Sequence, residues 1–289
     1  MLKKGSSGND VKELQSFLGI KEDGIFGTKT ENFVKKWQSE NNLIPDGIVG
    51  PATWDAMGIL STDSTGKTFQ TKEGLNIKKY YLDSKEFYTE SKPEYLFLHH
   101  TAGWENPYKC IDDWNNDNRG RIATEFVIGG QSINGLSRHN GETLQAFPPG
   151  CWGWHLGTGR SHMHKNSVGI EVCNFGWIKN GKTYTGARVR EDQIITLGKP
   201  FKGYREWHKY SDEQLKSLKK LILYIAERDN IDVKNGLPKL IREKGSSAFE
   251  YNQDAKSGKI KGLLNHTNVN MQKFDMFPQN ELLDMLLSL

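Results

Sequence analysis

The chain has 289 residues and a formal net charge of +4, and 36% of its residues are hydrophobic. This length and composition are typical of one large folded domain or two modest ones, and they argue against a disordered chain. Lysine and arginine are interspersed with acidic residues, and no apolar run reaches the roughly 18 residues of a membrane helix. We therefore expect no nucleic-acid partner and no membrane-spanning segment, and we expect a monomer.

The start of the chain and its cysteines indicate in which cellular compartment the protein is made. The residues after Leu2 are polar, whereas a secretory signal needs an apolar stretch, so we expect synthesis in a host cytoplasm without a signal peptide. Cys110, Cys151 and Cys173 are odd in number and show no short Cys-x-x-Cys spacing. We therefore expect reduced structural thiols rather than a disulfide framework or a thiolate zinc site.

An internal repeat with an offset of 23 residues occupies the first sixty positions. Each copy predicts an amphipathic helix, a turn at Asp-Gly and the start of another helix near a threonine. The copies read Leu14-Gln15, Asp23-Gly-Ile-Phe-Gly27, Thr30 and Trp37-Gln38, Asp46-Gly-Ile-Val-Gly50, Thr53. The apolar stripes consist of Val11, Leu14 and Leu18, and of Phe33, Val34 and Trp37. We expect a small all-α domain with these stripes in its core.

This doubled motif resembles the small helical peptidoglycan-binding module found at the ends of many cell-wall hydrolases. The resemblance covers residues 3 to about 58 and implies that a domain over 1–60 binds peptidoglycan. From the residues alone, the repeat could equally serve only to build a helical bundle, because none of them identifies a sugar or peptide pocket. Residues 61–75 are poor in large apolar side chains and rich in turn formers, which predicts a linker.

Strands and helices alternate in the remainder of the chain. Buried strands are expected over 95–99, 124–128 and 168–173. Helices are expected to open at Asn106-Pro107, to follow the capping box Ser211-Asp-Glu-Gln214, and to span 278–287. This alternation predicts an α/β domain over 76–289, with a mixed central sheet flanked by helices.

Two histidines and an aspartate stand out as candidate metal ligands. His99 ends the strand Tyr-Leu-Phe-Leu-His-His-Thr, and His266 and Asp275 follow far along the chain, nine residues apart. Hydrolytic zinc is commonly held by three such side chains, which leaves a fourth position open for water or a substrate carbonyl. The spacing of His266 and Asp275 is too long for one helical face, so we expect a strand end and the loop that follows it.

Four motifs in order resemble the zinc-dependent N-acetylmuramoyl-L-alanine amidases of type 2, which are related to peptidoglycan-recognition proteins and phage lysins. They are Leu-Phe-Leu-His99-His-Thr-Ala-Gly, Gly-Trp154-His155-Leu-Gly157, Ser167-Val-Gly-Ile-Glu171-Val, and Asn-His266 with Lys273-x-Asp275. The resemblance covers roughly 76–289 and implies zinc bound by His99, His266 and Asp275. His100 should then point to the other face of its strand, because strand side chains alternate.

The resemblance also implies roles for further residues. Glu171 would be the general base for the zinc-activated water, and Lys273 would stabilise the oxyanion. Trp154 and His155 would hold the substrate. The residues alone leave simpler readings open: an edge-strand carboxylate facing solvent, a surface lysine, and a buried tryptophan beside a structural histidine.

Several positions depart from the family pattern. Thr124 stands where some phage relatives carry a catalytic tyrosine, Glu125 where histidine is frequent, and Asn268 where aspartate is common. Residues 178–210 and 232–259 look like insertions that either wall the substrate groove or decorate the surface. We expect His162 and His164 to be solvated loop residues.

The sequence thus predicts a hydrolase that cleaves the amide between N-acetylmuramic acid and L-alanine in bacterial peptidoglycan. The architecture suggests a phage endolysin. Two alternatives stay open: a recognition or anchoring protein on the same fold without catalysis, and a zinc endopeptidase that acts on the stem peptide.

Overall fold

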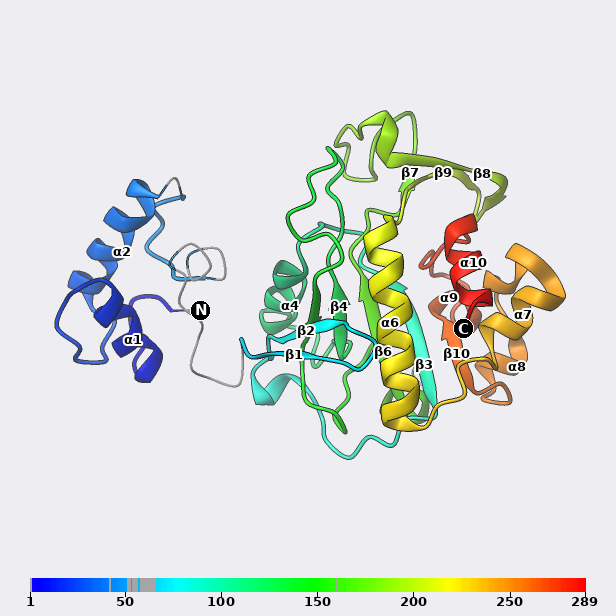
Figure 1. Cartoon of the computed structure of the whole chain (residues 1–289), viewed down its shortest axis with the longest axis horizontal. Coiled ribbons are helices and arrows are strands. Elements are labelled where there is room, and N and C mark those ends of the chain that lie inside the picture. Colours follow the sequence, from blue (N-terminus) through cyan, green and yellow to red (C-terminus); the bar gives the residue numbers. More distant parts are fainter. Residues whose placement is uncertain are drawn as a thin grey trace. The chain divides into compact units, whose positions relative to one another are not determined.

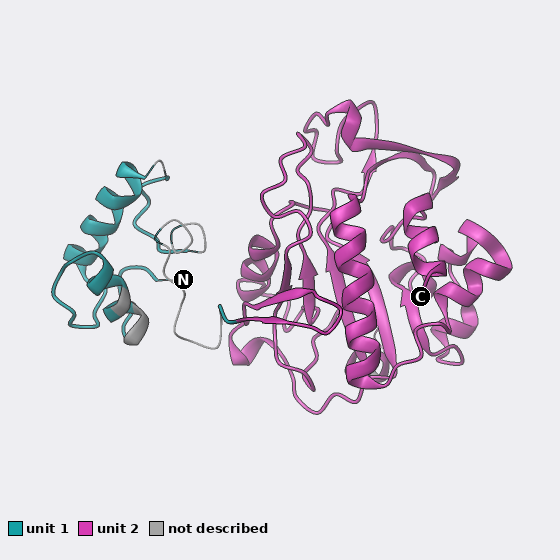
Figure 2. Cartoon of the chain, in the orientation of Figure 1, with its two compact units in different colours: residues 1–67 teal, residues 68–289 magenta. Residues whose placement is uncertain are grey.

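A computed structural model of the protein describes residues 2–41, 43–50, 53, 57, 66–157, 159 and 161–289. The chain divides into two units, residues 1–67 and residues 68–289 (Figure 2). Across the described residues, none of the helices combines the length and the apolar character needed to cross a bilayer. The three cysteines are free thiols, and Cys173 is buried.

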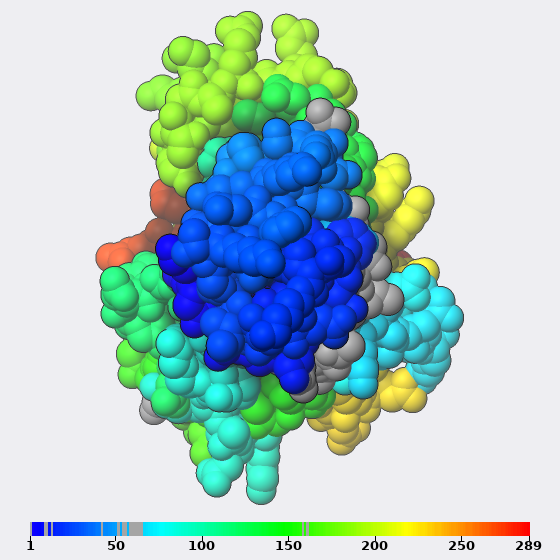
Figure 3. Space-filling model, turned by 90° about the vertical axis from the view of Figure 1, so that its left-hand side faces the viewer, coloured from blue at the N-terminus to red at the C-terminus, as the bar shows by residue number. Residues whose placement is uncertain are grey.

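The first unit contains α1 (Asn9–Phe17) and α2 (Thr28–Glu40), the two helices expected from the repeat (Figure 1). Figure 3 shows the atoms of this unit in blue. Val11, Leu14 and Val34 are buried as predicted. Phe33 is 37% exposed, so its assignment to the core is wrong. The buried residues of α2 are Thr30, Val34 and Gln38, which lie four residues apart, and Phe33 falls beside this stripe. The helix expected near Thr53 lies mostly outside the described residues.

One glutamine in each copy of the repeat holds the turn that follows its helix. Gln15 Nε2 donates to Asp23 Oδ1 at 2.8 Å and to Thr30 Oγ1 at 3.2 Å, and its Oε1 accepts from Gly24 N at 2.8 Å. The equivalent contacts of Gln38 are to Asp46 at 3.0 Å, Thr53 at 3.2 Å and Gly47 at 2.9 Å. The polar residues of the motif therefore build the unit from within, which explains why they recur together.

The second unit is built on a seven-stranded sheet (Figure 1). In spatial order its strands are β1 (Thr68–Gln70), β2 (Asn76–Lys79), β5 (Thr143–Gln145), β4 (Phe126–Ile128), β6 (Ser167–Val172), β3 (Tyr95–His100) and β10 (Gly262–Asn265). β4, β6, β3 and β10 are parallel, whereas β5 is antiparallel to β4 and β1 is antiparallel to β2. The predicted mixed sheet is confirmed, as are the three predicted strands, which correspond to β3, β4 and β6.

The second unit begins at Thr68, inside the range 61–75 that the sequence predicts as a linker. β1 pairs with β2, and Leu75 is buried in the main core. The segment was hard to recognise because β1 is an edge strand of three residues, held by backbone hydrogen bonds rather than by an apolar pattern. Residues 61–65 of the predicted linker lie outside the described residues.

Helices cover both faces of the sheet. α6 (Asp212–Asp229) crosses one face (Figure 1), where Leu96 and Leu98 of β3 share a buried cluster with Leu218. On the other face, Ile111 of α4 (Pro107–Asn115) shares a cluster with Val127 of β4. The remaining helices are α5 (Ser161–Lys165), α7 (Leu237–Lys244), α8 (Gln253–Lys256), α9 (His266–Val269) and α10 (Asn280–Leu287). The predicted capping box of α6 and the Asn106 cap of α4 are both present.

Both segments expected to be insertions contribute to the core, so surface decoration is the wrong interpretation for either. Residues 178–210 supply most of a second sheet, in the order β7 (Trp177–Ile178), β9 (Tyr204–His208) and β8 (Ile194–Phe201). The rings of Trp207 and Tyr210 stack on Phe277 with centroids 4.6 and 4.5 Å apart. Residues 232–259 include α7 and α8 and bury Leu237 and Phe249 completely.

Three buried histidines make the stability of the fold sensitive to acid. Burial lowers the pKa of His100, His164 and His208 from 6.5 to about 4. Between pH 6.5 and pH 4 the unfolded chain therefore binds more protons than the folded chain, and the free energy of unfolding falls as the pH falls. From pH 7 to pH 4.5 we expect a loss on the order of 2 kcal/mol per histidine, measurable by urea unfolding.

The variant His208→Asn is a matched control for this effect. An asparagine Oδ1 can accept the hydrogen bond that His208 Nδ1 accepts from Phe175 N at 3.3 Å, but it does not titrate. The variant should lose less stability than the wild-type chain over the same pH range. An equal loss in the two proteins would contradict the role given to His208.

Candidate active site

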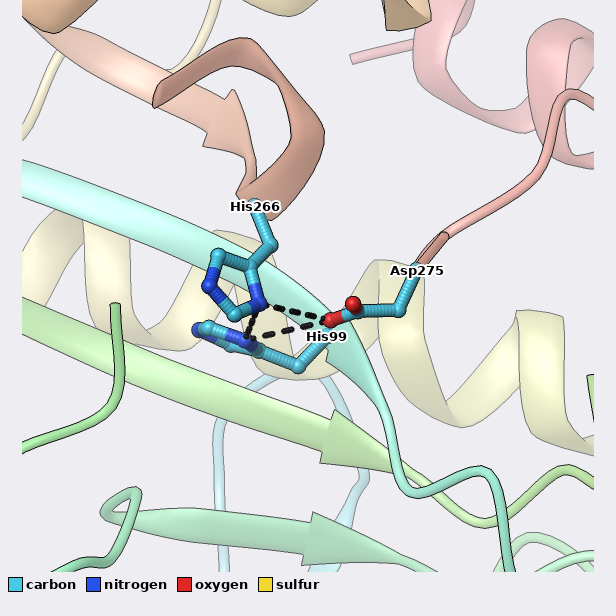
Figure 4. Close-up of side chains that lie close together, drawn as sticks. All are labelled: His99, His266 and Asp275. Atoms are coloured by element: carbon cyan, nitrogen blue, oxygen red, sulfur yellow. Dashed lines mark hydrogen bonds and ion pairs between the residues drawn. The ribbon is translucent and has the colours of Figure 1, made fainter. Parts of the chain in front are cut away.

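The register of three parallel strands brings the candidate residues to one edge of the sheet. His99 of β3 lies opposite Glu171 of β6, and Leu98 lies opposite Asn265 of β10. His266, the next residue after β10, therefore reaches the level of His99. Asp275 comes from the loop between α9 and α10 (Figure 4). The carboxyl ends of parallel strands are a common place for ligand sites, and the predicted strand-end and loop positions are confirmed.

The side chains of His99, His266 and Asp275 converge on one point (Figure 4). His99 Nδ1 lies 2.9 Å from His266 Nδ1, and Asp275 Oδ2 lies 2.8 Å from His266 Nδ1 and 3.4 Å from His99 Nδ1. All three residues are buried. His100 Nδ1 instead contacts the Tyr210 hydroxyl at 2.9 Å, so the two histidines take different sides as expected.

These three atoms suit a zinc ion. Ligand bonds of about 2.0–2.1 Å at tetrahedral angles place ligand atoms about 3.3 Å apart, close to the three distances observed. The Nε2 of His266 donates to Leu156 O at 3.0 Å, so the lone pair of this ring is on Nδ1 and faces the other two residues. Two imidazole nitrogens and a carboxylate at this separation need a cation or a shared proton between them.

The charges of the cluster favour a cation over protons. Burial, and then the proximity of His266, lowers the pKa of His99 to about 4. Burial alone would raise the pKa of Asp275, but His266 and His99 outweigh it and hold this pKa well below its usual value. A neutral imidazole and an ionised carboxylate are the protonation states that a metal requires.

His155 and Ser167 form a second layer behind His99. His99 Nε2 lies 2.9 Å from His155 Nδ1, and His155 Nε2 lies 2.8 Å from Ser167 Oγ. Such contacts fix the tautomer and the ring orientation of a metal-binding histidine. The motif Trp154-His155 suggested substrate contact, and it gave no signal for these partners, which lie 56 and 12 residues away in sequence.

His164 completes this layer, and its expected position in a solvated loop is wrong. It is buried in α5, and its Nδ1 accepts from His155 N at 3.0 Å. The short helix has too few residues to show a periodic pattern, so the sequence did not reveal it. His162, in the same helix, is exposed.

Glu171 occupies the centre of the sheet, because β6 lies between β4 and β3, so the alternative of an edge-strand carboxylate is wrong. Its Oε2 is buried and has no hydrogen-bond partner among the described residues. Burial and the nearby charge of Asp275 raise the pKa of Glu171 well above its ordinary value, and Lys273 opposes the shift. A buried carboxylate oxygen without a hydrogen-bond partner has a cost, which a role in proton transfer would explain.

An open cleft of about 480 Å³ lies in front of these residues. Trp154, His155, Glu171, His266, Lys273 and Asp275 all line it. The cleft also contains residues that sequence reasoning did not single out, notably Trp114, Arg119, Gln272 and Phe274. In the described part of the chain, no residue of 178–210 or 232–259 is among those that line it.

Comparisons with known proteins identify the family of the second unit. Residues 89–258 match the sequence model described as N-acetylmuramoyl-L-alanine amidase, which is more than half of the chain. The chain belongs to this amidase family. Residues 7–57 match the model of a peptidoglycan binding domain. A curated protein of Kitasatospora aureofaciens, described as uncharacterized, is 42% identical over 72 residues, or 22% of this chain; the chain spans only 61% of that relative's length.

The solved structures found by comparison share little sequence with this chain. A mutant endolysin from Bacillus subtilis is 15% identical, with a TM-score of 0.38 over 66% of this chain and 84% of that one. An N-acetylmuramoyl-L-alanine amidase from Clostridium intestinale is 14% identical, with a TM-score of 0.37 over 71% of this chain and 90% of that one.

The departures of this chain from its family's motifs have local structural explanations. The side chain of Thr124 is buried and donates to Phe126 O at 3.0 Å. Glu125 forms a buried ion pair with Arg228, which a histidine could not supply in the same way. Asn268 Oδ1 accepts from Asn265 N at 2.9 Å and so caps the short helix that begins at His266.

Proposed function

We propose that the protein is a zinc-dependent hydrolase that cleaves the amide between N-acetylmuramic acid and L-alanine in peptidoglycan. The observation that carries this proposal is the convergence of His99, His266 and Asp275 beside Glu171, whose Oε2 is buried without a hydrogen-bond partner among the described residues, next to an open cleft. Family membership supplies the scissile bond. A recognition protein without catalysis would have no use for a buried base next to a metal site.

In this proposal, Zn²⁺ is held by His99, His266 and Asp275, and when bound it supplies Lewis acidity toward water and the substrate carbonyl. Glu171 accepts a proton from the attacking water and passes it to the leaving amide nitrogen. Lys273 faces the cleft and stabilises negative charge on the carbonyl oxygen. Trp154 forms part of the cleft wall against the substrate. His155 also lines the cleft, but its two ring contacts indicate that it mainly holds His99 in place.

The products formed from purified sacculi test this activity. Cleavage of the proposed bond releases new amino-terminal alanine and creates no new reducing sugar ends. New amino groups on other stem residues would show a zinc endopeptidase instead. Retention on sacculi with no product at all would show a recognition protein, and either result would contradict the proposal.

We propose that the unit over residues 1–60 attaches the enzyme to the wall. It has a separate buried core, formed by Val11, Leu14, Phe26, Val34 and Val49 among others. Deleting residues 1–67 should reduce retention on sacculi while kcat on a soluble muropeptide stays within about twofold, because tethering only raises local concentration. Co-sedimentation and single-substrate kinetics measure the two effects. Equal retention of the truncated and full-length proteins would contradict the assignment.

We further propose that the protein acts as an endolysin-like lytic enzyme, because a wall-attachment unit is joined to a peptidoglycan amidase. Added to cells whose walls are accessible, it should lower culture turbidity. If such cells stay intact at protein concentrations that digest purified sacculi, the lytic role is contradicted.

A further inference from the structure

Four aromatic rings form a row beside the cleft, and three of them belong to the second sheet or its β7–β8 connection. Trp177 and Tyr204 stack with their centroids 4.3 Å apart. Tyr184 lies 6.3 Å from Trp177 at one end, and Phe274 lies 6.1 Å from Tyr204 at the other. We call these four residues the ring row. The sequence separates them by almost a hundred positions, so only the fold brings them together.

Both ends of the ring row are attached to residues that line the cleft. Phe274 is itself a lining residue, between Lys273 and Asp275. At the other end, the Tyr184 hydroxyl donates to Ala102 O at 2.7 Å, and Ala102 also lines the cleft. In addition, Lys202 Nζ donates to Met271 O at 2.8 Å and ties the β8–β9 turn to the loop that carries Asp275. The row is therefore continuous with the candidate active site.

The outer rings are available to a ligand. Tyr184 is 52% exposed and Phe274 is 38% exposed, while Trp177 and Tyr204 are half-buried. Aromatic rings usually bury more of their surface, and exposed rings beside a cleft are typical of a binding surface. Flat ligands with apolar C–H faces, such as sugar rings, suit a row of this kind.

The segment that carries most of the ring row is also strongly basic. Residues 178–210 contain eight lysines and arginines and three acidic residues, whereas the whole chain has a net charge of only +4. A basic surface attracts anionic ligands. Hydrolysis of the muramyl amide leaves a carboxylate on the lactyl group, so a glycan strand gains negative charge as its peptides are removed.

We propose that the ring row binds the glycan strand of peptidoglycan, next to the muramic acid whose amide is cleaved. This inference rests on the proposed amidase function. The sugar rings stack on the exposed aromatic faces, and lactyl carboxylates freed by earlier cleavages are attracted by the basic residues of 178–210. The surface would make the enzyme prefer long glycan strands, including partly stripped ones, to single muramyl peptides.

The test compares Tyr184→Ala with the matched variant Tyr184→Phe on two soluble substrates. One is a muramyl peptide with a single sugar, and the other is a glycan of several disaccharides that carries the same stem peptide. The measured quantity is the ratio of kcat/KM for the glycan to kcat/KM for the single-sugar substrate. Tyr184→Ala should lower this ratio about two- to tenfold, the range expected for one aromatic contact. Tyr184→Phe keeps the ring and should retain most of the wild-type ratio.

Three results would overturn the proposal. The ratio could be unchanged in Tyr184→Ala, or it could fall equally in both variants, which would point to the hydroxyl contact with Ala102 instead of stacking. Thirdly, Tyr184→Ala could lower kcat/KM for a single-sugar substrate whose stem peptide has been lengthened. That result would make the stem peptide, not the glycan, the occupant of the ring row. Failure of the amidase function is a separate observation: the wild-type protein would release no amino-terminal alanine from either substrate.

Discussion

Replacing Glu171 by glutamine should reduce hydrolysis of muramyl peptides by about 10²- to 10⁴-fold, the usual contribution of a positioned general base. The amide of glutamine occupies the same place in β6 but cannot take a proton from water at neutral pH. Zinc content and retention on sacculi should remain those of the wild-type chain, because Glu171 is outside the cluster of candidate ligands. Single-turnover kinetics with a soluble muropeptide, alongside metal analysis, measure these effects.

The variant Glu171→Asp separates the loss of a carboxylate from a general disturbance of the strand. It keeps the acid but withdraws it by one methylene, so it should recover part of the lost rate. A Glu171→Gln enzyme with nearly full activity would remove this residue from the mechanism. Loss of zinc in that variant would instead move Glu171 into the metal site.

Replacing His99 by alanine should abolish both zinc binding and hydrolysis. Even the loss of an outer partner of a metal ligand typically weakens binding about 10- to 100-fold, and removal of a ligand should exceed that. The neighbouring variant His100→Asn is the matched control. His100 contacts Tyr210 in a direction away from the cluster, and an asparagine Oδ1 can replace its Nδ1 there.

We expect His100→Asn to keep its zinc, although its stability falls. Competition with a chromophoric chelator measures the affinity of both variants. Loss of zinc in His100→Asn, with zinc retained in His99→Ala, would reverse the assignment of the two histidines. The pair is informative because the two residues are adjacent in sequence and differ only in the side of β3 from which they project.

Local patterns in the sequence predicted much of the fold. Strand alternation predicted that His99 and His100 point to opposite faces, and the capping box at Ser211 placed the start of α6. Both patterns depend only on residues that are neighbours in sequence, so they can be recognised without knowing how the rest of the chain folds. The separation of His266 and Asp275 also indicated a strand end followed by a loop, which Figure 4 shows.

Features that depend on distant contacts could not be predicted. β1 is stabilised by pairing with β2, whereas its own composition is that of a linker. The contacts of His155 with His99 and with His164 exist only because the segment between β5 and α5 meets β3 and α5. The ring row likewise requires the second sheet to lie against the loop that ends at Asp275. The candidate ligands His99, His266 and Asp275 follow local sequence patterns, whereas the residues that hold them in place do not.

X-ray absorption spectroscopy at the zinc edge tests the central claim most directly. For the purified, zinc-loaded protein we predict two imidazole nitrogens and one carboxylate oxygen, with one further oxygen from water, all at about 2.0–2.2 Å. His266→Ala should lose one imidazole from this set or fail to bind the metal. A sulfur ligand, a shell without imidazole, or a wild-type protein that binds no zinc would contradict the site formed by His99, His266 and Asp275.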